Sequence, residues 1–109
     1  MWTTHRPRSL ALLLAVAGLL GCGAASAQAA QDLHLRALAA TCANCHGTDG
    51  RAVQGSAIPS LAGLPRDYIA QQMRAFQNGS RAATVMAQIA KGFNAEQLDA
   101  LAAYFAAQK

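Results

Sequence analysis

Three residues near the middle of the chain combine thiol and metal-binding chemistry: Cys42, Cys45 and His46. Residues three apart on a helical turn lie on one face, so both thiols can face one edge of a flat porphyrin. Each sulfur can then add to a vinyl group on that edge and form a thioether, and the histidine can bind the porphyrin iron as its proximal ligand. Cys-x-x-Cys-His is typical of c-type haem attachment, so the motif predicts one covalently bound haem c.

Two other kinds of site use similar residues. A thioredoxin-like redox couple also has two cysteines at this spacing, but it is expected in a βαβ setting, whereas the sequence around Cys42 is rich in alanine. A structural zinc ion needs four ligands. Beyond the motif only His34 is available, and the adjacent Cys45 and His46 would have to share one tetrahedron. The pattern therefore favours haem.

A haem iron with one histidine needs either a second protein ligand or an open position, and methionine is a common second ligand. Met73 falls within a periodic apolar stretch, which indicates packing in a core. Met86 stands at a loop-to-helix junction, far enough beyond His46 along the chain to reach the opposite haem face. We expect Met86 to be the distal ligand and His34 to face solvent.

The apolar spacing predicts a first helix over residues 32–42, with Asp32 at its start. Residues 47–63 contain several glycines and Pro59, which indicates a loop. A second helix is expected from Pro65 to Asn78, because proline is favoured in a first helical turn and Gly79 follows as a stop. Its predicted apolar face contains four residues: Tyr68, Ile69, Met73 and Phe76.

The C-terminal part predicts a short helix and then a longer one. Residues 81–92 are expected to form a loop that passes into a short helix, with Gly92 as the stop. Asn94 is a good N-cap, and Gln97 stands where a capping box needs it. The last helix should run nearly to Lys109, with four residues facing inward: Leu98, Leu101, Ala102 and Phe105. The predicted fold class is all-α.

The first 27 residues have the features of a signal peptide. His5, Arg6 and Arg8 form a positively charged segment, an apolar run follows from Leu10 to Leu20, and Ala25-Ser26-Ala27 offers small residues for cleavage. The apolar run is short for a permanent membrane span. We therefore expect an exported, periplasmic protein in which residues 28–109 form a mono-haem domain without a transmembrane span.

Cys22 offers an alternative to cleavage near Ala27. Leu19-Leu20-Gly21-Cys22 resembles a lipobox, at which a bacterial lipoprotein is acylated on its cysteine. Cleavage near Ala27 would discard Cys22, and this outcome is favoured because the small residues lie at the expected distance from the apolar run. Acylation would leave the protein anchored to a membrane by lipid.

The charge of the chain argues against nucleic acid as a partner. The full chain has a formal net charge of +4, but loss of Arg6 and Arg8 with a signal peptide would reduce this to about +2. No basic run with interleaved aromatic residues is present in the sequence. The chain also has no dinucleotide-binding glycine motif, so any flavin or nicotinamide would belong to a separate protein.

Four segments together look like a class I cytochrome c: Cys42-Ala43-Asn44-Cys45-His46-Gly47, Pro59-Ser60-Leu61-Ala62-Gly63, Met86-Ala87-Gln88-Ile89-Ala90-Lys91-Gly92-Phe93 and Leu101-Ala102-Ala103-Tyr104-Phe105. Within that class the chain is most similar to the cytochrome subunit of flavocytochrome c sulfide dehydrogenase and to the halves of periplasmic di-haem cytochromes. The resemblance covers nearly all of residues 32–108. This chain has one haem motif, which departs from the di-haem members.

The resemblance implies a small fold of three to five helices around the haem, with the first and last helices crossing. It also implies that Pro59 turns its carbonyl toward His46, where this contact would orient the imidazole and raise its basicity. It supports Met86 as the second iron ligand.

These residues lead to an electron-transfer hypothesis and two alternatives. With His46 and Met86 both bound, the iron has no free position and can only cycle between the ferrous and ferric states, as in a periplasmic electron carrier that is not an enzyme. The partners would be redox proteins, such as a terminal oxidase or reductase. Alternatively, the chain is the haem subunit of a flavoprotein sulfide dehydrogenase and accepts electrons from its flavin subunit. A third class is an open-site haem enzyme or gas sensor, in which Met86 only packs.

Overall fold

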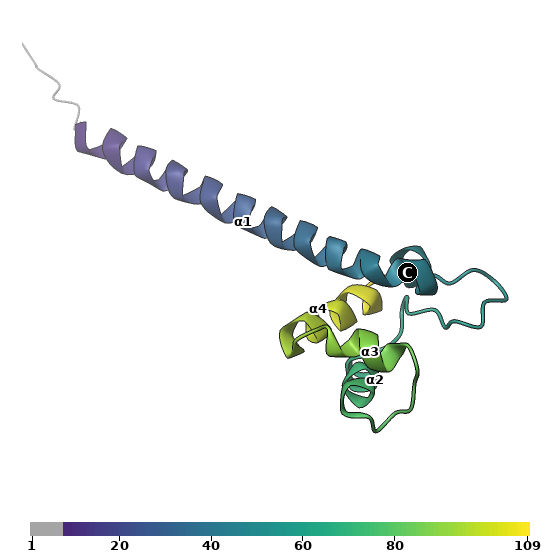
Figure 1. Cartoon of the computed structure of the whole chain (residues 1–109). Coiled ribbons are helices and arrows are strands. Elements are labelled where there is room, and N and C mark those ends of the chain that lie inside the picture. The colour runs from purple at the N-terminus through teal and green to yellow at the C-terminus, as the bar shows by residue number, and fades with distance from the viewer. Residues whose placement is uncertain (1–7) are drawn as a thin grey trace, which may run out of the picture. The chain divides into compact units, whose positions relative to one another are not determined.

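The computed structural model describes the backbone of residues 8–109 and the side chains of residues 23–109, and the regular elements of this part are all helical (Figure 1). This confirms the predicted all-α class. The elements are α1 (Arg8–His46), the 3₁₀ turn η1 (Thr48–Gly50), α2 (Arg66–Asn78), α3 (Met86–Lys91) and α4 (Ala95–Ala106). The chain divides into two compact units between Leu33 and His34, and the fold described below is that of the second unit.

Helix α1 differs from the prediction at both ends, because it also continues to His46 instead of ending at Cys42. It starts at Arg8 rather than at Asp32, so the prediction that Asp32 starts the helix was wrong. Alanine and leucine are strong helix formers, and they dominate the residues before Asp32, so nothing there stops a helix. Asp32 lies on the exposed helix surface, where its Oδ1 accepts a hydrogen bond from Gln28 Nε2 at 3.3 Å.

The predicted signal peptide remains a prediction. His5 and Arg6 lie outside the described residues, and so do the side chains of Arg8 and Cys22. Among the helices that the structure describes, none combines the length and apolar character required to cross a bilayer.

The local signals at the ends of α2 and α4 operate as predicted. Pro65 is the N-cap of α2, and Gly79 ends that helix in the left-handed conformation with φ of 81°. At α4, Gln97 N donates to Asn94 Oδ1 at 2.8 Å, and Asn94 N donates to Gln97 Oε1 at 2.9 Å. These two reciprocal bonds are the capping box that the sequence predicts.

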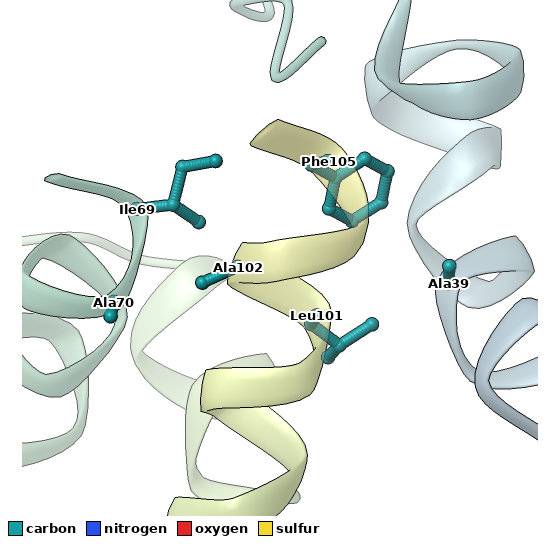
Figure 2. Packing of buried hydrophobic residues seen from close by; sticks show 6 residues of the cluster. All are labelled: Ala39, Ile69, Ala70, Leu101, Ala102 and Phe105. Atoms are coloured by element: carbon teal, nitrogen blue, oxygen red, sulfur yellow. The ribbon is translucent and has the colours of Figure 1, made fainter. Parts of the chain in front are cut away.

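The core of this unit lies among α1, α2 and α4 (Figure 2). Ala39 of α1 belongs to the same buried cluster as Leu101 and Phe105 of α4, so the first and last helices share a core. The cluster comprises Ala39, Ile69, Ala70, Leu101, Ala102 and Phe105, and Met73 packs against it as expected. All four residues predicted to face inward from α4 are buried: Leu98, Leu101, Ala102 and Phe105.

Tyr68 is an exception on α2, because its side chain is 47% exposed and therefore does not belong to the buried face. Successive residues of an α-helix point about 100° apart, and the buried residues Ile69, Ala70 and Phe76 define the side of α2 that faces the core. Tyr68 lies away from the middle of that side. The predicted apolar face is thus correct for Ile69, Met73 and Phe76 but wrong for Tyr68.

The segment between α1 and α2 is a loop that α4 holds in place. Gly50 is buried, and its carbonyl accepts hydrogen bonds from Leu61 N at 2.7 Å and Ala62 N at 3.1 Å. Gly63 N donates to Phe105 O at 3.0 Å, and Tyr104 Oη donates to Asp49 Oδ1 at 2.7 Å. The predicted loop is present, with the short η1 turn at its beginning, and these bonds fix its return toward α1.

Candidate haem site

His46 is the last residue of α1 and has a defined orientation. Only 9% of the residue is exposed, and its Nδ1 lies 2.7 Å from the carbonyl oxygen of Pro59. A carbonyl can only accept a hydrogen bond, so Nδ1 must carry the proton and donate it. The lone pair of the imidazole is then on Nε2, which is the form that binds a metal ion. This contact is the one that the family resemblance implies.

Gly47 allows the chain to leave the helix directly after His46. Its φ is +82°, and a Cβ atom at this position would lie 1.9 Å from the carbonyl oxygen of Arg51. Only glycine fits both the conformation and the space. Gly47 N still donates to Ala43 O at 2.9 Å, while Gly50 N donates to Gly47 O at 3.0 Å. The loop can therefore turn at once and bring Pro59 back to His46. Sequence reasoning did not single out this requirement, although a glycine directly after the histidine was a visible signal.

Cys42 and Cys45 lie on the last turns of α1, and both are free thiols. Cys42 is half-buried and packs against the core cluster, whereas Cys45 is exposed. Burial raises the pKa of the Cys42 thiol, an effect that the hydrogen bond with Thr41 partly opposes. Since both residues belong to one helix at the i, i+3 spacing, their side chains share a face.

The zinc alternative has no support in the described residues, because no group of three or more His, Cys, Asp or Glu side chains there could hold a metal ion. His34 is exposed on α1, as expected. The cysteines and His46 thus lack the additional ligands that a structural zinc ion requires.

Met86 begins α3 and is half-buried. Of the predicted site residues, His46 and Pro59 are in direct contact. Met86 lies on a different element, α3. The other methionine of interest, Met73, packs against the core cluster, in agreement with its predicted packing role.

The residues around these candidate ligands fit a large apolar group. Ile58 precedes Pro59 and is 40% exposed. Val85 precedes Met86 and is 61% exposed, and Ile89, three residues after Met86, is 40% exposed. Large aliphatic side chains are usually buried, and here they adjoin the residues that the sequence assigns to haem. An apolar porphyrin would remove such surface from water, with a free Nε2 for its iron and two thiols for its attachment.

Comparison with known proteins finds similarity to cytochromes over much of the chain. Residues 29–105 match the family described as "Cytochrome C oxidase, cbb3-type, subunit III". The cytochrome subunit of sulfide dehydrogenase from Chlorobaculum tepidum is 46% identical over 68 residues, which are 62% of this chain and 60% of that protein. Cytochrome c-554(548) from Halomonas halodenitrificans is 33% identical over 72 residues, which are 63% of this chain and 86% of that protein.

A solved structure also resembles the chain. It is cytochrome c4 from Acidithiobacillus ferrooxidans, with a TM-score of 0.56 and 43% identity, and the match covers 60% of this chain and 37% of that one. The chain therefore spans less than two thirds of the length of the sulfide dehydrogenase subunit and of this cytochrome c4. With the matched family covering most of the chain, this protein belongs to the cytochrome c family and carries covalently bound haem c.

Proposed function

We propose that this protein is an electron carrier in which His46 and Met86 bind the haem iron from opposite sides and Cys42 and Cys45 attach the porphyrin. The observation that carries this proposal is the 2.7 Å contact between His46 Nδ1 and the Pro59 carbonyl, which leaves Nε2 free for iron. When bound, haem supplies an iron that gains or loses one electron, and a thioether ligand favours its reduced state.

The roles of the protein residues follow from their positions. The Pro59 carbonyl fixes the tautomer and the ring orientation of His46, and by accepting its proton in a hydrogen bond it increases the electron density on Nε2. Met86 would supply the second protein ligand of the iron, which would leave no open position for a substrate and would make the protein a carrier rather than an enzyme. Cys45 is exposed, so this end of α1 is accessible to a redox partner through a small, transient interface.

The first experiment is the optical spectrum of the oxidised, haem-loaded protein beside that of Met86→Ala. We expect a weak near-infrared charge-transfer band from sulfur to iron in the wild type and none in Met86→Ala. Met73→Leu is the matched control, since it replaces a methionine that packs against the core with a side chain of similar volume. A high-spin wild-type spectrum that changes on addition of carbon monoxide would instead indicate an open iron and would overturn the proposal.

We also propose that the protein acts in the periplasm, after removal of residues 1–27. The mass of the exported product tests this, because cleavage near Ala27 and acylation at Cys22 leave different N-termini. The first gives an unmodified chain beginning near Gln28, and the second gives a lipid-anchored chain beginning at Cys22.

A second candidate function is that of the haem subunit of a sulfide dehydrogenase. It is favoured by the 46% identity to the cytochrome subunit of such an enzyme. In that case the haem-loaded protein should form a stable complex with a flavoprotein and be reduced by it when sulfide is added. A free carrier would accept electrons from its partners without co-purifying with any of them.

A further inference from the structure

Helix α3, which begins with Met86, is too short to be stable by itself. It comprises only Met86–Lys91, and its N-cap, Val85, provides no side-chain hydrogen bond to the helix. Isolated helices of fewer than about 12 residues are marginal in water, because nucleation is costly and few bonds follow it. The position of Met86 must therefore be set by contacts between α3 and the rest of the domain.

Gln77 of α2 makes such a contact. Its side chain is partly buried, and Nε2 donates to the carbonyl oxygens of Ala90 and Phe93, each at 2.8 Å. The last carbonyls of a helix have no partner within the helix, so a donor from elsewhere is most useful at this end. Ala90 belongs to α3, and Phe93 follows the C-cap of this helix, Gly92. Among the described residues, Gln77 is the side chain of another element that forms hydrogen bonds with this segment.

Ala90, the residue of α3 that Gln77 binds, lies one helical turn after Met86. Ala90 follows Met86 by four residues, so the two lie one turn apart on the same face of the helix. Ala90 is fully buried, and Phe93 packs against the core cluster. Both carbonyls that Gln77 binds thus belong to the part of the segment that contacts the domain core.

From this geometry we propose that Gln77 is a positioning residue that holds α3 against α2 and thereby keeps the Met86 sulfur at the iron. This inference depends on the proposed function, in which Met86 is the distal ligand. Loss of the amide would remove its hydrogen bond to Phe93 O and leave Ala90 O with its backbone donors, such as Phe93 N at 3.3 Å. The setting is partly buried, where a lost hydrogen bond is costly. The segment would then move more readily, and an external ligand could replace Met86 at the iron.

The test is a cyanide titration of the oxidised, haem-loaded protein for the wild type, Gln77→Met, Met86→Ala and Gln71→Met. Methionine has about the length of glutamine and no amide donor, and Gln71 is an exposed glutamine of the same helix. Loss of two hydrogen bonds should raise the cyanide affinity of Gln77→Met by about 5- to 100-fold, whereas Gln71→Met should equal the wild type. The near-infrared band of Gln77→Met should persist, because Met86 is still present.

Urea denaturation of the same variants separates a positioning role from a purely structural one. If Gln77→Met is less stable but binds cyanide as the wild type does, Gln77 only stabilises the fold and the inference is wrong. If Gln77→Met does not accumulate with haem, Gln77→Asn replaces it, because its shorter amide can reach at most one carbonyl. Its cyanide affinity should rise about 3- to 10-fold, and an unchanged value would refute the inference.

Failure of the inference and failure of the proposed function give different results. When Met86→Ala binds cyanide much more tightly than the wild type and Gln77→Met does not, Met86 is a ligand and only the role of Gln77 is wrong. When Met86→Ala and the wild type have equal cyanide affinity, Met86 is not a ligand, and both proposals fail.

Discussion

Substitution of Gly47 by alanine should damage the haem site far more than the same change at other glycines with positive φ. Three glycines have nearly equal positive φ values: Gly47 at 82°, Gly55 at 82° and Gly79 at 81°. Around Gly55 and Gly79 an added Cβ would meet nothing within 4 Å, whereas at Gly47 it would lie 1.9 Å from Arg51 O. Their ψ angles differ, since Gly79 has ψ of 2° and is left-handed helical, whereas Gly47 has ψ of 163°, in a region that is essentially restricted to glycine. Gly47→Ala therefore combines a less favourable backbone conformation with a steric clash, and the controls carry only the cost of their positive φ.

The expected magnitudes follow from these two terms. A residue other than glycine in the left-handed region costs about 1–2 kcal/mol, which is the whole effect expected for Gly55→Ala and Gly79→Ala. Gly47→Ala carries a backbone cost of about 1–3 kcal/mol, because its φ and ψ lie in a region that is essentially restricted to glycine. It also requires the Arg51 carbonyl to move, as in an overpacked core, which adds about 1–3 kcal/mol. Since Arg51 lies on the loop that returns to Pro59, its displacement should also weaken the contact between Pro59 and His46.

Urea denaturation of the haem-loaded variants measures the free energies of unfolding, and the optical spectrum reports the iron ligands. We expect Gly47→Ala to lose at least twice as much free energy as either control and to bind less haem during expression. Equal losses in the three variants would show that the clash relaxes without cost, and the assigned role of Gly47 in forming the turn after His46 would be refuted.

Three further predictions concern the elements that support the site. The hydrogen bond to Asp49 raises the pKa of Tyr104, so the folded state holds this proton more tightly than the unfolded state. That stabilisation is complete below about pH 10 and is lost as the pH rises through the higher pKa of the folded state. In urea denaturation at alkaline pH, the free energy of unfolding should therefore fall more steeply with pH for the wild type than for Tyr104→Phe. Parallel curves for the two proteins would contradict this reasoning. Asn94→Ala removes the capping box of α4 and should lower the free energy of unfolding by about 1 kcal/mol in urea denaturation. An unchanged free energy would mean that water replaces the cap fully. Leu98→Ala empties a fully buried position and should lower the free energy of unfolding by about 2–5 kcal/mol in the same assay; a loss below 1 kcal/mol would mean that the core collapses onto the space.

Much of the fold could be predicted because its signals are local. Gly79 and the Asn94–Gln97 pair define the ends of α2 and α4 through interactions within a few residues, and the structure contains both. Prediction failed where two local signals pointed to different structures. Asp32 can cap a helix, but the alanine-rich sequence before it continues the helix instead. Tyr68 is a large, partly apolar side chain beside Ile69, yet the side of α2 that faces the core contains Ile69 and not Tyr68.

The sequence by itself determined the chemistry of this protein, because two thiols and an imidazole at fixed spacing on one helix end suffice to attach and ligate haem. The tertiary structure decided how that chemistry is held in place. The contact of His46 with Pro59, the space that only Gly47 fits and the anchoring of α3 by Gln77 all join residues that come together only when the chain folds. Periodicity and capping describe a few neighbouring residues, whereas these contacts depend on where a loop returns and how one helix packs on another.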